Sequence, residues 1–386
     1  MKIIALCVAL LAAGAVEQIK EPNVEATGAV LVEVDSGRIL WGKAEEQPLA
    51  MASTTKIMTA VVVLEYGKLD EIVTVSKLAA AAPKVKMNLQ AGEEIKLNDL
   101  LHALMLQSSN DAAVAIAEHI SGSVEEFCVA MTTKAHQLGA VNTIFETASG
   151  LDKGSHQSTA ADLAIITRYA LQNPDFRKLI ATPSWQATSS HKSYQITNKN
   201  RLLNEYEGAF GVKTGFTNKA GHCFVGAAEK GEMELVSVVL ASGWGNRGKE
   251  QKWVDTKRLL NYGFENFEMQ NIVGENDVAG ILEVTRTKTP QISLHYGEGI
   301  TIPVRIDGEQ IDLTAHFPTQ MQAPVEAGME IGEGRLYING KHFVSIPIYT
   351  AESAERHDLK TSLEKVIREF LRIGSSQEIQ IVLPEF

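Results

Sequence analysis

The chain has 386 residues, 45% of them hydrophobic and 22% charged, with a formal net charge of −11. It contains enough apolar material for a sizeable core and is longer than one average domain, so we expect two domains. A surface this acidic argues against nucleic acid as a partner, because phosphate binding relies on clustered Lys and Arg.

The N-terminus predicts a cleaved secretory signal peptide over residues 1–15. Lys2 precedes an apolar run that is too short to cross a bilayer, and Ala13-Gly14-Ala15 has the small-residue pattern of a signal peptidase site. The alternative is a buried N-terminal strand or helix. A signal peptide would place the mature protein outside the cytoplasmic membrane.

Residues 22–275 predict an α+β domain in which helices pack on an antiparallel sheet. Two alternating runs within 28–41 meet at Asp35-Ser36-Gly37, which is a hairpin signal. Three more alternating runs between 209 and 242 predict an antiparallel meander, so strands from both ends of the domain would share one sheet. Helices are expected within 51–67, 98–121 (two runs interrupted at 107–110), 124–139, 158–172 and 255–267.

The texture of the sequence changes after residue 275. Residues 276–350 contain short β-rich runs separated by turns such as Asp307-Gly308 and Asn339-Gly340, which predicts a small all-β sandwich. Residues 351–386 predict an amphipathic helix and a tail, with apolar side chains at helical spacing opposite a face of mixed charge. This helix would either pack on the protein or make peripheral contact with a membrane surface.

Cysteine usage indicates neither a disulfide framework nor a zinc site. Cys7 lies in the predicted signal peptide, and Cys128 and Cys223 lack metal-ligand spacing. We expect both to be buried thiols, and we expect no metal and no organic cofactor.

Ser53-Thr54-Thr55-Lys56 stands at the start of the first predicted helix. Positions three apart share a helix face, so the lysine can be the base that a serine nucleophile needs, provided that burial or a second cation lowers its pKa. The alternative is that Ser53 is an ordinary N-cap. S-x-x-K also begins at Ser189 and Ser362, but there it lies in a polar loop and on the polar side of a helix.

Two further motifs support the nucleophile interpretation. Ser108-Ser109-Asn110 gives S-x-N in the break between two helices, and Lys213-Thr214-Gly215 gives K-T-G on a strand. S-x-x-K, S-x-N and K-T-G in this order and on these elements match the signature of penicillin-binding proteins and serine β-lactamases.

The chain resembles a low-molecular-mass penicillin-binding protein, a serine-type D-alanyl-D-alanine carboxypeptidase of the peptidase S11 family. The similar stretches cover most of 28–265 and include MASTTKIMTA, LLHALMLQSSNDAAVAIAEH and GVKTGFTNKAGHCFVGAA. The resemblance implies a penicillin-binding-protein/β-lactamase-like transpeptidase domain. Residues 279–350 resemble the C-terminal domain of the family more loosely, and the final helix stands where many members carry an amphipathic membrane anchor.

The resemblance implies four catalytic residues. Ser53 would attack the carbonyl of the penultimate D-alanine and carry the acyl group, and Lys56 would take its proton. Ser108 would pass a proton to the leaving amine, and Asn110 would position Lys56 and the substrate amide.

The resemblance also implies a substrate-binding strand. Lys213 and Thr214 would meet the terminal carboxylate of D-alanine, and Gly215 would let the substrate backbone lie close to the strand. Phe216 follows K-T-G where some members have His, and its backbone N–H would join that of Ser53 in an oxyanion hole.

Four other residues match family segments near this site. Relatives often place a cation facing the carboxylate pocket in the stretch that holds Arg247 and Lys252, and Lys252 fits the alignment better. The alternative for both is a solvated charge. His156 and Asp162 are expected to be structural supports.

The implied substrates are peptidoglycan stem peptides ending in D-Ala-D-Ala, and β-lactams would be covalent inhibitors. A class A β-lactamase would carry a glutamate in E-x-x-L-N, but the similar stretch here has Asn200 in that place and lies close before K-T-G. A non-catalytic β-lactam sensor is usually fused to membrane spans, and no second hydrophobic run here has spanning length. Endopeptidase activity on cross-linked peptides would use the same chemistry.

Overall fold

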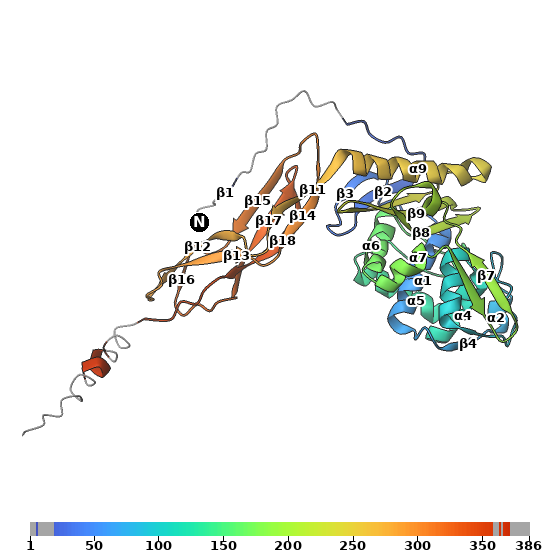
Figure 1. The fold of residues 1–386 in the computed structure, drawn as a ribbon, viewed down its shortest axis with the longest axis horizontal. Coiled ribbons are helices and arrows are strands. Elements are labelled where there is room, and N and C mark those ends of the chain that lie inside the picture. The colour runs from blue at the N-terminus through green and yellow to red at the C-terminus, as the bar shows by residue number, and fades with distance from the viewer. Residues whose placement is uncertain (1–4, 7–18, 358–362, 364–365, 371–386) are drawn as a thin grey trace, which may run out of the picture. The chain divides into compact units, whose positions relative to one another are not determined.

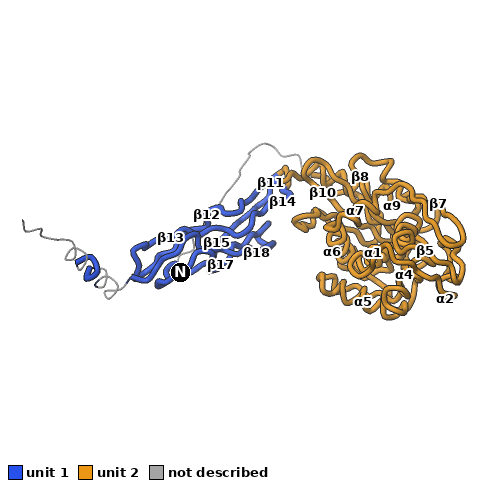
Figure 2. The backbone as a smooth tube through the Cα atoms, turned by 60° about the horizontal axis from the view of Figure 1, so that its bottom comes forward, with its two compact units in different colours: residues 1–16, 270–304, 308–386 blue, residues 17–269, 305–307 orange. Residues whose placement is uncertain are grey.

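The computed structural model describes residues 5–6, 19–357, 363 and 366–370. It divides into two compact units, which Figure 2 colours separately. The larger unit comprises residues 17–269 and 305–307, and the β-rich unit comprises residues 1–16, 270–304 and 308–386. The domain boundary at residue 275 stays a prediction.

One five-stranded antiparallel sheet forms the centre of the larger unit. Its strand order is β3-β2-β10-β9-β8, and register pairs such as Leu31 with Ser237 join the early hairpin to the late meander. The predicted sharing of one sheet by strands from both ends of the domain is therefore confirmed. The strands are β2 (Gly28–Glu33), β3 (Ile39–Lys43), β8 (Ala209–Thr217), β9 (Gly221–Lys230) and β10 (Met233–Leu240).

Helices cover both faces of this sheet, as Figure 1 shows. The long helix α9 packs on one face over a core that includes Phe224, Leu235 and Leu259. The remaining larger helices pack on the other face around α1, whose residues from Lys56 to Val63 are all buried. The helices are α1 (Lys56–Tyr66), α2 (Lys77–Ala80), α3 (Leu97–His102), α4 (Asn110–Ser121), α5 (Val124–Gln137), α6 (Ala160–Leu171), α7 (Pro174–Ala181), α8 (Leu202–Glu205) and α9 (Gly245–Asn266).

Helix starts follow the local sequence in several places. Ser123 and Thr159 accept hydrogen bonds from the backbone N–H groups three residues ahead, and Asn173 caps α7 just before Pro174. The short 3₁₀ turn η1 (Ala52–Thr55) precedes α1, and the π-helical turn η2 (Ala103–Gln107) follows α3. Two small hairpins, β4 (Ile72–Thr74) with β5 (Glu94–Lys96) and β6 (Ser184–Thr188) with β7 (Ser193–Thr197), were not foreseen from the sequence.

The helix predicted over 255–267 begins ten residues earlier than expected. Its first turn contains Gly245 and Gly248, and glycine weakens a helix prediction. A Cβ at position 248 would lie 2.2 Å from the carbonyl carbon of Gly243. Glycine is thus required for α9 to begin so close to the preceding turn.

The β-rich unit has its own apolar core, which includes Leu282, Leu294, Leu336 and Ile348. Its main sheet has the order β1-β15-β17-β18-β13-β12-β16, and a second sheet pairs β11 with β14. The prediction of a β-rich second domain is confirmed. The strands are β1 (Ala5–Leu6), β11 (Phe267–Val273), β12 (Val278–Thr285), β13 (Gln291–Tyr296), β14 (Ile300–Arg305), β15 (Ile311–His316), β16 (Gln320–Gln322), β17 (Glu330–Ile338) and β18 (Lys341–Thr350).

Both terminal predictions fall largely outside the described residues. Of the predicted signal peptide, only Ala5–Leu6 is described, as strand β1. Of the predicted C-terminal helix, residues 363 and 366–370 are described and are helical. No helix among the described residues is long and apolar enough to cross a membrane.

Candidate active site

Ser53 lies in the 3₁₀ turn η1, and Lys56 is the first residue of α1. The Lys56 Nζ atom is 3.0 Å from the Ser53 Oγ atom. Neither η1 nor α1 has a side-chain N-cap, so the alternative that Ser53 is an ordinary cap is wrong. Ala52 has φ +50°, a conformation that is costly for a residue with a Cβ, and such backbone strain is concentrated at functional sites.

Lys56 is fully buried and contacts two oxygens besides the Ser53 hydroxyl. They are Oδ1 of Asn110, at 2.9 Å, and the backbone carbonyl of Ser149. Both of these oxygens only accept hydrogen bonds, and a neutral amine has two N–H donors and one lone pair. The two donors therefore satisfy Asn110 and Ser149, and the lone pair is left for the proton of Ser53.

The surroundings favour this neutral form of Lys56. Burial is the largest cause of a Lys56 pKa well below 10.5, and the nearby cation of Lys213 lowers it further. The Asp111 carboxylate opposes the shift, but it is already engaged by backbone N–H groups of Met87 and Leu89. Lys56 is thus equipped to act as a base.

The S-x-N segment lies at the break between η2 and α4. Asn110 is fixed by its side-chain N–H bond to the Pro83 carbonyl at 3.2 Å, which orients its oxygen toward Lys56. Ser108 is half-buried and has φ +70°, and its hydroxyl has no hydrogen-bond partner among the described residues. The structure therefore links Asn110 to Lys56 by a hydrogen bond. Ser108 has no such bond among the described residues and is placed near the site only because it lies two residues before Asn110 in the chain.

The K-T-G segment lies on the edge strand β8, beside the 3₁₀ turn that holds Ser53. A Cβ at Gly215 would lie 3.0 Å from the Ser53 backbone nitrogen and 3.1 Å from the Ala52 Cβ. The space at Gly215 is thus filled by the chain's own backbone, and the absence of a side chain lets β8 approach the nucleophile. Lys213, two residues earlier on the same face, is also buried.

Lys213 is the second lysine of the site. Burial lowers its pKa to about 7, with contributions from the cations of Lys199 and Lys252. Its Nζ atom donates a hydrogen bond to the Thr214 carbonyl at 3.0 Å. Thr214 is half-buried on the opposite face of the strand.

Phe216 and Lys252 extend the site toward α9. The Phe216 ring is 45% exposed and stacks on the ring of His222, with 4.3 Å between centroids. Lys252 is buried, and burial is the main cause that lowers its pKa to about 8. Its Nζ atom lies 4.9 Å from the centre of the Trp253 ring. Arg247 is instead exposed and paired with Glu25 at 2.8 Å. The solvated alternative therefore describes Arg247 but not Lys252.

The two residues expected to be structural supports do bind neighbouring segments. The backbone N–H of Glu146 donates to His156 Nδ1, so His156 carries its proton on Nε2 and donates it to Thr55 Oγ1 at 2.8 Å. Burial lowers the His156 pKa to about 4, which keeps the ring neutral. Asp162 accepts hydrogen bonds from the backbone of Asn142 and the hydroxyl of Thr143.

Ser149 and Gly150 were missed by sequence reasoning. The Ser149 carbonyl accepts a hydrogen bond from Lys56, and its oxygen lies 3.4 Å from the Ser53 Oγ atom. Gly150 has φ +85°, and a Cβ there would lie 2.0 Å from the Ala52 carbonyl oxygen. A backbone carbonyl carries no residue-type signal, so only the glycine could have drawn attention.

The Gly150→Ala substitution is expected to lower the free energy of unfolding by more than the conformational penalty alone. That penalty, for a non-glycine residue in left-handed conformation, is about 1 to 2 kcal/mol. Gly92 provides a matched control, because it has φ +86° and no atom within 4 Å of its Cβ position. Denaturant unfolding should show Gly150→Ala to be clearly less stable than Gly92→Ala. Equal losses would mean that the contact with Ala52 is not tight.

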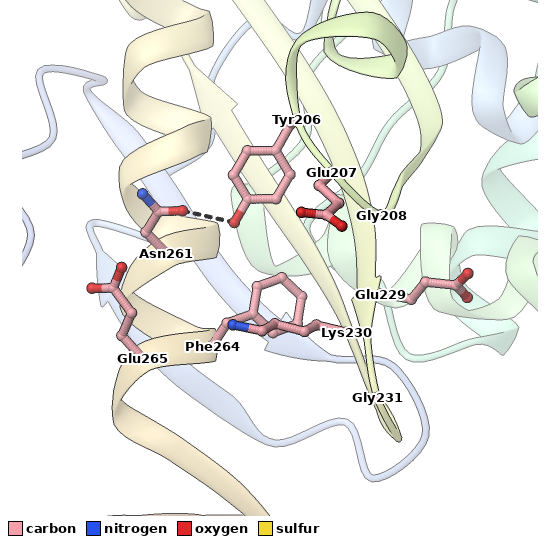
Figure 3. Close-up of a pocket in the computed structure, with 9 residues that line it drawn as sticks. All are labelled: Tyr206, Glu207, Gly208, Glu229, Lys230, Gly231, Asn261, Phe264 and Glu265. Atoms are coloured by element: carbon pink, nitrogen blue, oxygen red, sulfur yellow. Dashed lines mark hydrogen bonds between the residues drawn. The ribbon is translucent and has the colours of Figure 1, made fainter.

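A separate hollow of about 660 Å³ lies where β8 begins and β9 ends, against the C-terminal part of α9 (Figure 3). The Tyr206 hydroxyl donates to Asn261 Oδ1 there at 2.7 Å. No residue of the three motifs lines this hollow, so it is distinct from the candidate active site. Its lining residues are Tyr206, Glu207, Gly208, Glu229, Lys230, Gly231, Asn261, Phe264 and Glu265.

Comparison with known proteins identifies two family matches along the chain. The peptidase S11 family, described as D-alanyl-D-alanine carboxypeptidase, matches residues 15–243. The family described as penicillin-binding protein 5, C-terminal domain, matches residues 267–356.

Individual relatives cover nearly the whole chain. It is 31% identical over 356 residues to D-alanyl-D-alanine carboxypeptidase DacF of Bacillus subtilis, with 90% of each protein covered. It is 31% identical over 361 residues to D-alanyl-D-alanine carboxypeptidase DacC of Escherichia coli, with 88% of this chain and 86% of that protein covered. The crystal structure of penicillin binding protein 5 from Haemophilus influenzae matches with a TM-score of 0.76 at 28% identity, covering 88% of this chain and 100% of that one.

Proposed function

The chain belongs to the peptidase S11 family of serine-type D-alanyl-D-alanine carboxypeptidases, and we propose that Ser53 carries the acyl group in its reaction. The observation that carries this assignment is the placement of the Lys56 amine. The Nζ atom lies 3.0 Å from Ser53 Oγ and also contacts Asn110 Oδ1 and the Ser149 carbonyl. A neutral amine satisfies those two acceptors with its N–H groups and keeps its lone pair for the Ser53 proton. The substrates are peptidoglycan stem peptides that end in D-Ala-D-Ala.

Acylation begins when Ser53 Oγ attacks the carbonyl carbon of the penultimate D-alanine. The hydroxyl proton passes to Lys56 Nζ, and the backbone N–H groups of Ser53 and Phe216 bind the oxyanion. The C–N bond to the terminal D-alanine then breaks. Ser108 delivers a proton to the leaving amine and takes in its place the proton that Lys56 had accepted, so that Lys56 is neutral again. Water hydrolyses the ester in a second step and restores the Ser53 hydroxyl.

The terminal carboxylate binds at the K-T-G strand and α9. Lys213, Thr214 and Lys252 supply the recognition, because Lys213 and Lys252 are buried and neither has a carboxylate partner among the described residues. The bound carboxylate raises the pKa of both lysines and stabilises their charged form. In the free protein no such anion offsets the burial that keeps the pKa values of Lys213 and Lys252 low.

β-Lactams acylate Ser53 and are released slowly. The Asn200 side chain is buried, and its oxygen accepts a hydrogen bond from the Leu202 backbone N–H at 3.0 Å. It therefore supports a turn and offers no base for a deacylating water. Two assays test the proposed function together: release of free D-alanine from a peptide ending in D-Ala-D-Ala, and the mass of the protein after incubation with penicillin. No adduct, or one that vanishes within seconds, would contradict it.

Peptidoglycan lies outside the cytoplasm, so the protein is exported, with residues 1–15 as the signal. The C-terminal helix makes peripheral contact with the membrane. Its described apolar side chains are strongly exposed, at 62% for Leu363, 61% for Val366 and 77% for Phe370. Exposed apolar side chains on one amphipathic helix favour an interfacial position.

Deletion of residues 355–386 is expected to abolish co-sedimentation with anionic liposomes. The reason is the loss of the apolar face, so the double substitution Leu363→Asp and Phe370→Asp in the full chain should have the same effect. D-Alanine release from a soluble peptide should be unchanged in both proteins. Sedimentation that survives the deletion would show that the helix is not the contact.

A further inference from the structure

His222 lies beside the carboxylate end of the site, although no motif includes it. The antiparallel register places it directly opposite Phe216, and the two rings stack at an interplanar angle of 29°. His222 is 8% exposed, whereas Phe216 is 45% exposed. The histidine is therefore the buried member of this stacked pair, and Phe216 is the exposed member.

The hydrogen bonds of His222 fix its tautomer. Nε2 lies 3.1 Å from the Gly245 carbonyl oxygen, which only accepts, so Nε2 carries the proton. Nδ1 is then a bare acceptor, and it is buried with no hydrogen-bond partner among the described residues. A buried unpaired acceptor is costly, so this lone pair requires a functional explanation.

The donor that suits this lone pair is on α9. Gly245, Lys249 and Lys252 recur at i, i+4 and i+7, which places them on one helix face, and His222 contacts that face at Gly245. Lys252 is buried and forms no ion pair with any described residue, and its Nζ atom rests over the Trp253 ring.

We propose that His222 is a positioning residue for the substrate carboxylate, an inference that rests on the proposed function. When substrate binds, the His222 Nδ1 atom accepts a hydrogen bond from Lys252 and so directs that ammonium group to the terminal carboxylate. The stacked Phe216 ring holds the imidazole in place for this bond. A three-point arrangement of carboxylate, Lys252 and His222 pairs the Nδ1 acceptor, which is unpaired among the described residues of the free protein.

Protonation of His222 would reverse this effect, because an imidazolium can only donate and repels Lys252. Burial and the Lys252 charge lower the His222 pKa, so the ring is neutral at and above neutral pH. The charged groups that act on His222 are Lys252 and Lys249 on α9. The Asp152 carboxylate accepts a hydrogen bond from Thr217 at 3.0 Å on the neighbouring strand β8. We therefore expect KM for the carboxylate substrate to rise as the pH falls below about 6, near the ordinary titration range of histidine.

The test compares His222→Phe with His222→Asn. Phenylalanine keeps the stack on Phe216 but has no acceptor, whereas the asparagine amide oxygen stands near the position of Nδ1. We expect His222→Phe to raise KM for diacetyl-L-Lys-D-Ala-D-Ala roughly tenfold with little change in kcat, the loss typical of one hydrogen bond to a charged group. His222→Asn should recover most of that loss. The control is His119→Phe, at an exposed histidine on α4.

The same peptide with its C-terminal carboxylate amidated separates positioning from general damage. The amidated peptide is used as an inhibitor of D-alanine release from the carboxylate peptide. Its inhibition constant should be the same for wild type and His222→Phe. Equal weakening of both peptides, or a wild-type KM in His222→Phe, would overturn the proposal. If neither variant folds, a wild-type KM that stays flat between pH 7 and pH 5 overturns it as well. Loss of D-alanine release in the wild type would instead refute the proposed function itself.

Discussion

The Ser53→Ala variant is expected to release D-alanine at least about 10³-fold more slowly than wild type and to gain no mass from penicillin. The hydroxyl oxygen is the atom that forms the acyl bond, and the Lys56 amine has no other proton to take from this position. Stability should change by no more than about 1 kcal/mol, because a half-buried hydroxyl is removed and its partners Lys56 and Ser149 remain bonded to each other.

The chain provides a matched control for this experiment. Ser189 also begins an S-x-x-K sequence, but it is half-buried in the turn between β6 and β7, where its hydroxyl donates to the Lys192 carbonyl. Ser189→Ala should release D-alanine at the wild-type rate and form the penicillin adduct. Mass spectrometry of a proteolytic digest should find the adduct on the peptide that contains Ser53. An adduct on any other serine, or release that persists in Ser53→Ala, would contradict the assignment.

The sequence was informative wherever chemistry depends on residue type. Ser53, Lys56 and Asn110 could be named from their motifs because a nucleophile, a base and an amide have recognisable side chains. The shared sheet was also predictable, since alternating apolar positions mark a half-buried strand at either end of the domain. None of these inferences required a distance.

What escaped prediction depends on the backbone or on long-range packing. Ser149 acts through its carbonyl, which every residue possesses. The closeness of β8 to the nucleophile is visible only when the Cβ position of Gly215 is seen to meet Ser53. Burial distinguishes Lys252 from the exposed Arg247, and this difference depends on where α9 begins. The start of α9 was hard to predict because two glycines lie in its first turn. Tertiary packing overrides local propensity at such positions.

The lowered pKa of Lys56 makes the pH dependence of wild-type activity a direct test of the site. kcat/KM reports the free enzyme, in which Lys56 must be neutral and the carboxylate-binding lysines must be charged. Activity should therefore rise with pH through the lowered pKa of Lys56. It should fall again as Lys213, with a pKa of about 7, and Lys252, with a pKa of about 8, lose their protons.

The Lys56→Arg substitution is expected to reduce kcat/KM by roughly 10³-fold or more, although it keeps a positive charge and a long side chain. A guanidinium is always protonated, so it donates to Asn110 and Ser149 but has no lone pair for the Ser53 proton. The acid limb of the pH profile should disappear with the group that titrates, while the alkaline limb from Lys213 remains. Lys192→Arg, in the exposed S-x-x-K copy, should retain the wild-type rate and profile.

Size is the competing explanation for a loss in Lys56→Arg, because the site is fully buried and arginine is larger than lysine. Lys56→Met separates the two, since methionine fits the space but also lacks a base. Both variants should be equally inactive, and Lys56→Met should match wild type in its thermal unfolding more closely than Lys56→Arg. Activity in Lys56→Met near that of wild type would show that another group takes the Ser53 proton. An inactive arginine variant beside an active methionine variant would then trace the loss to crowding, and the lone pair of Lys56 would no longer explain the chemistry.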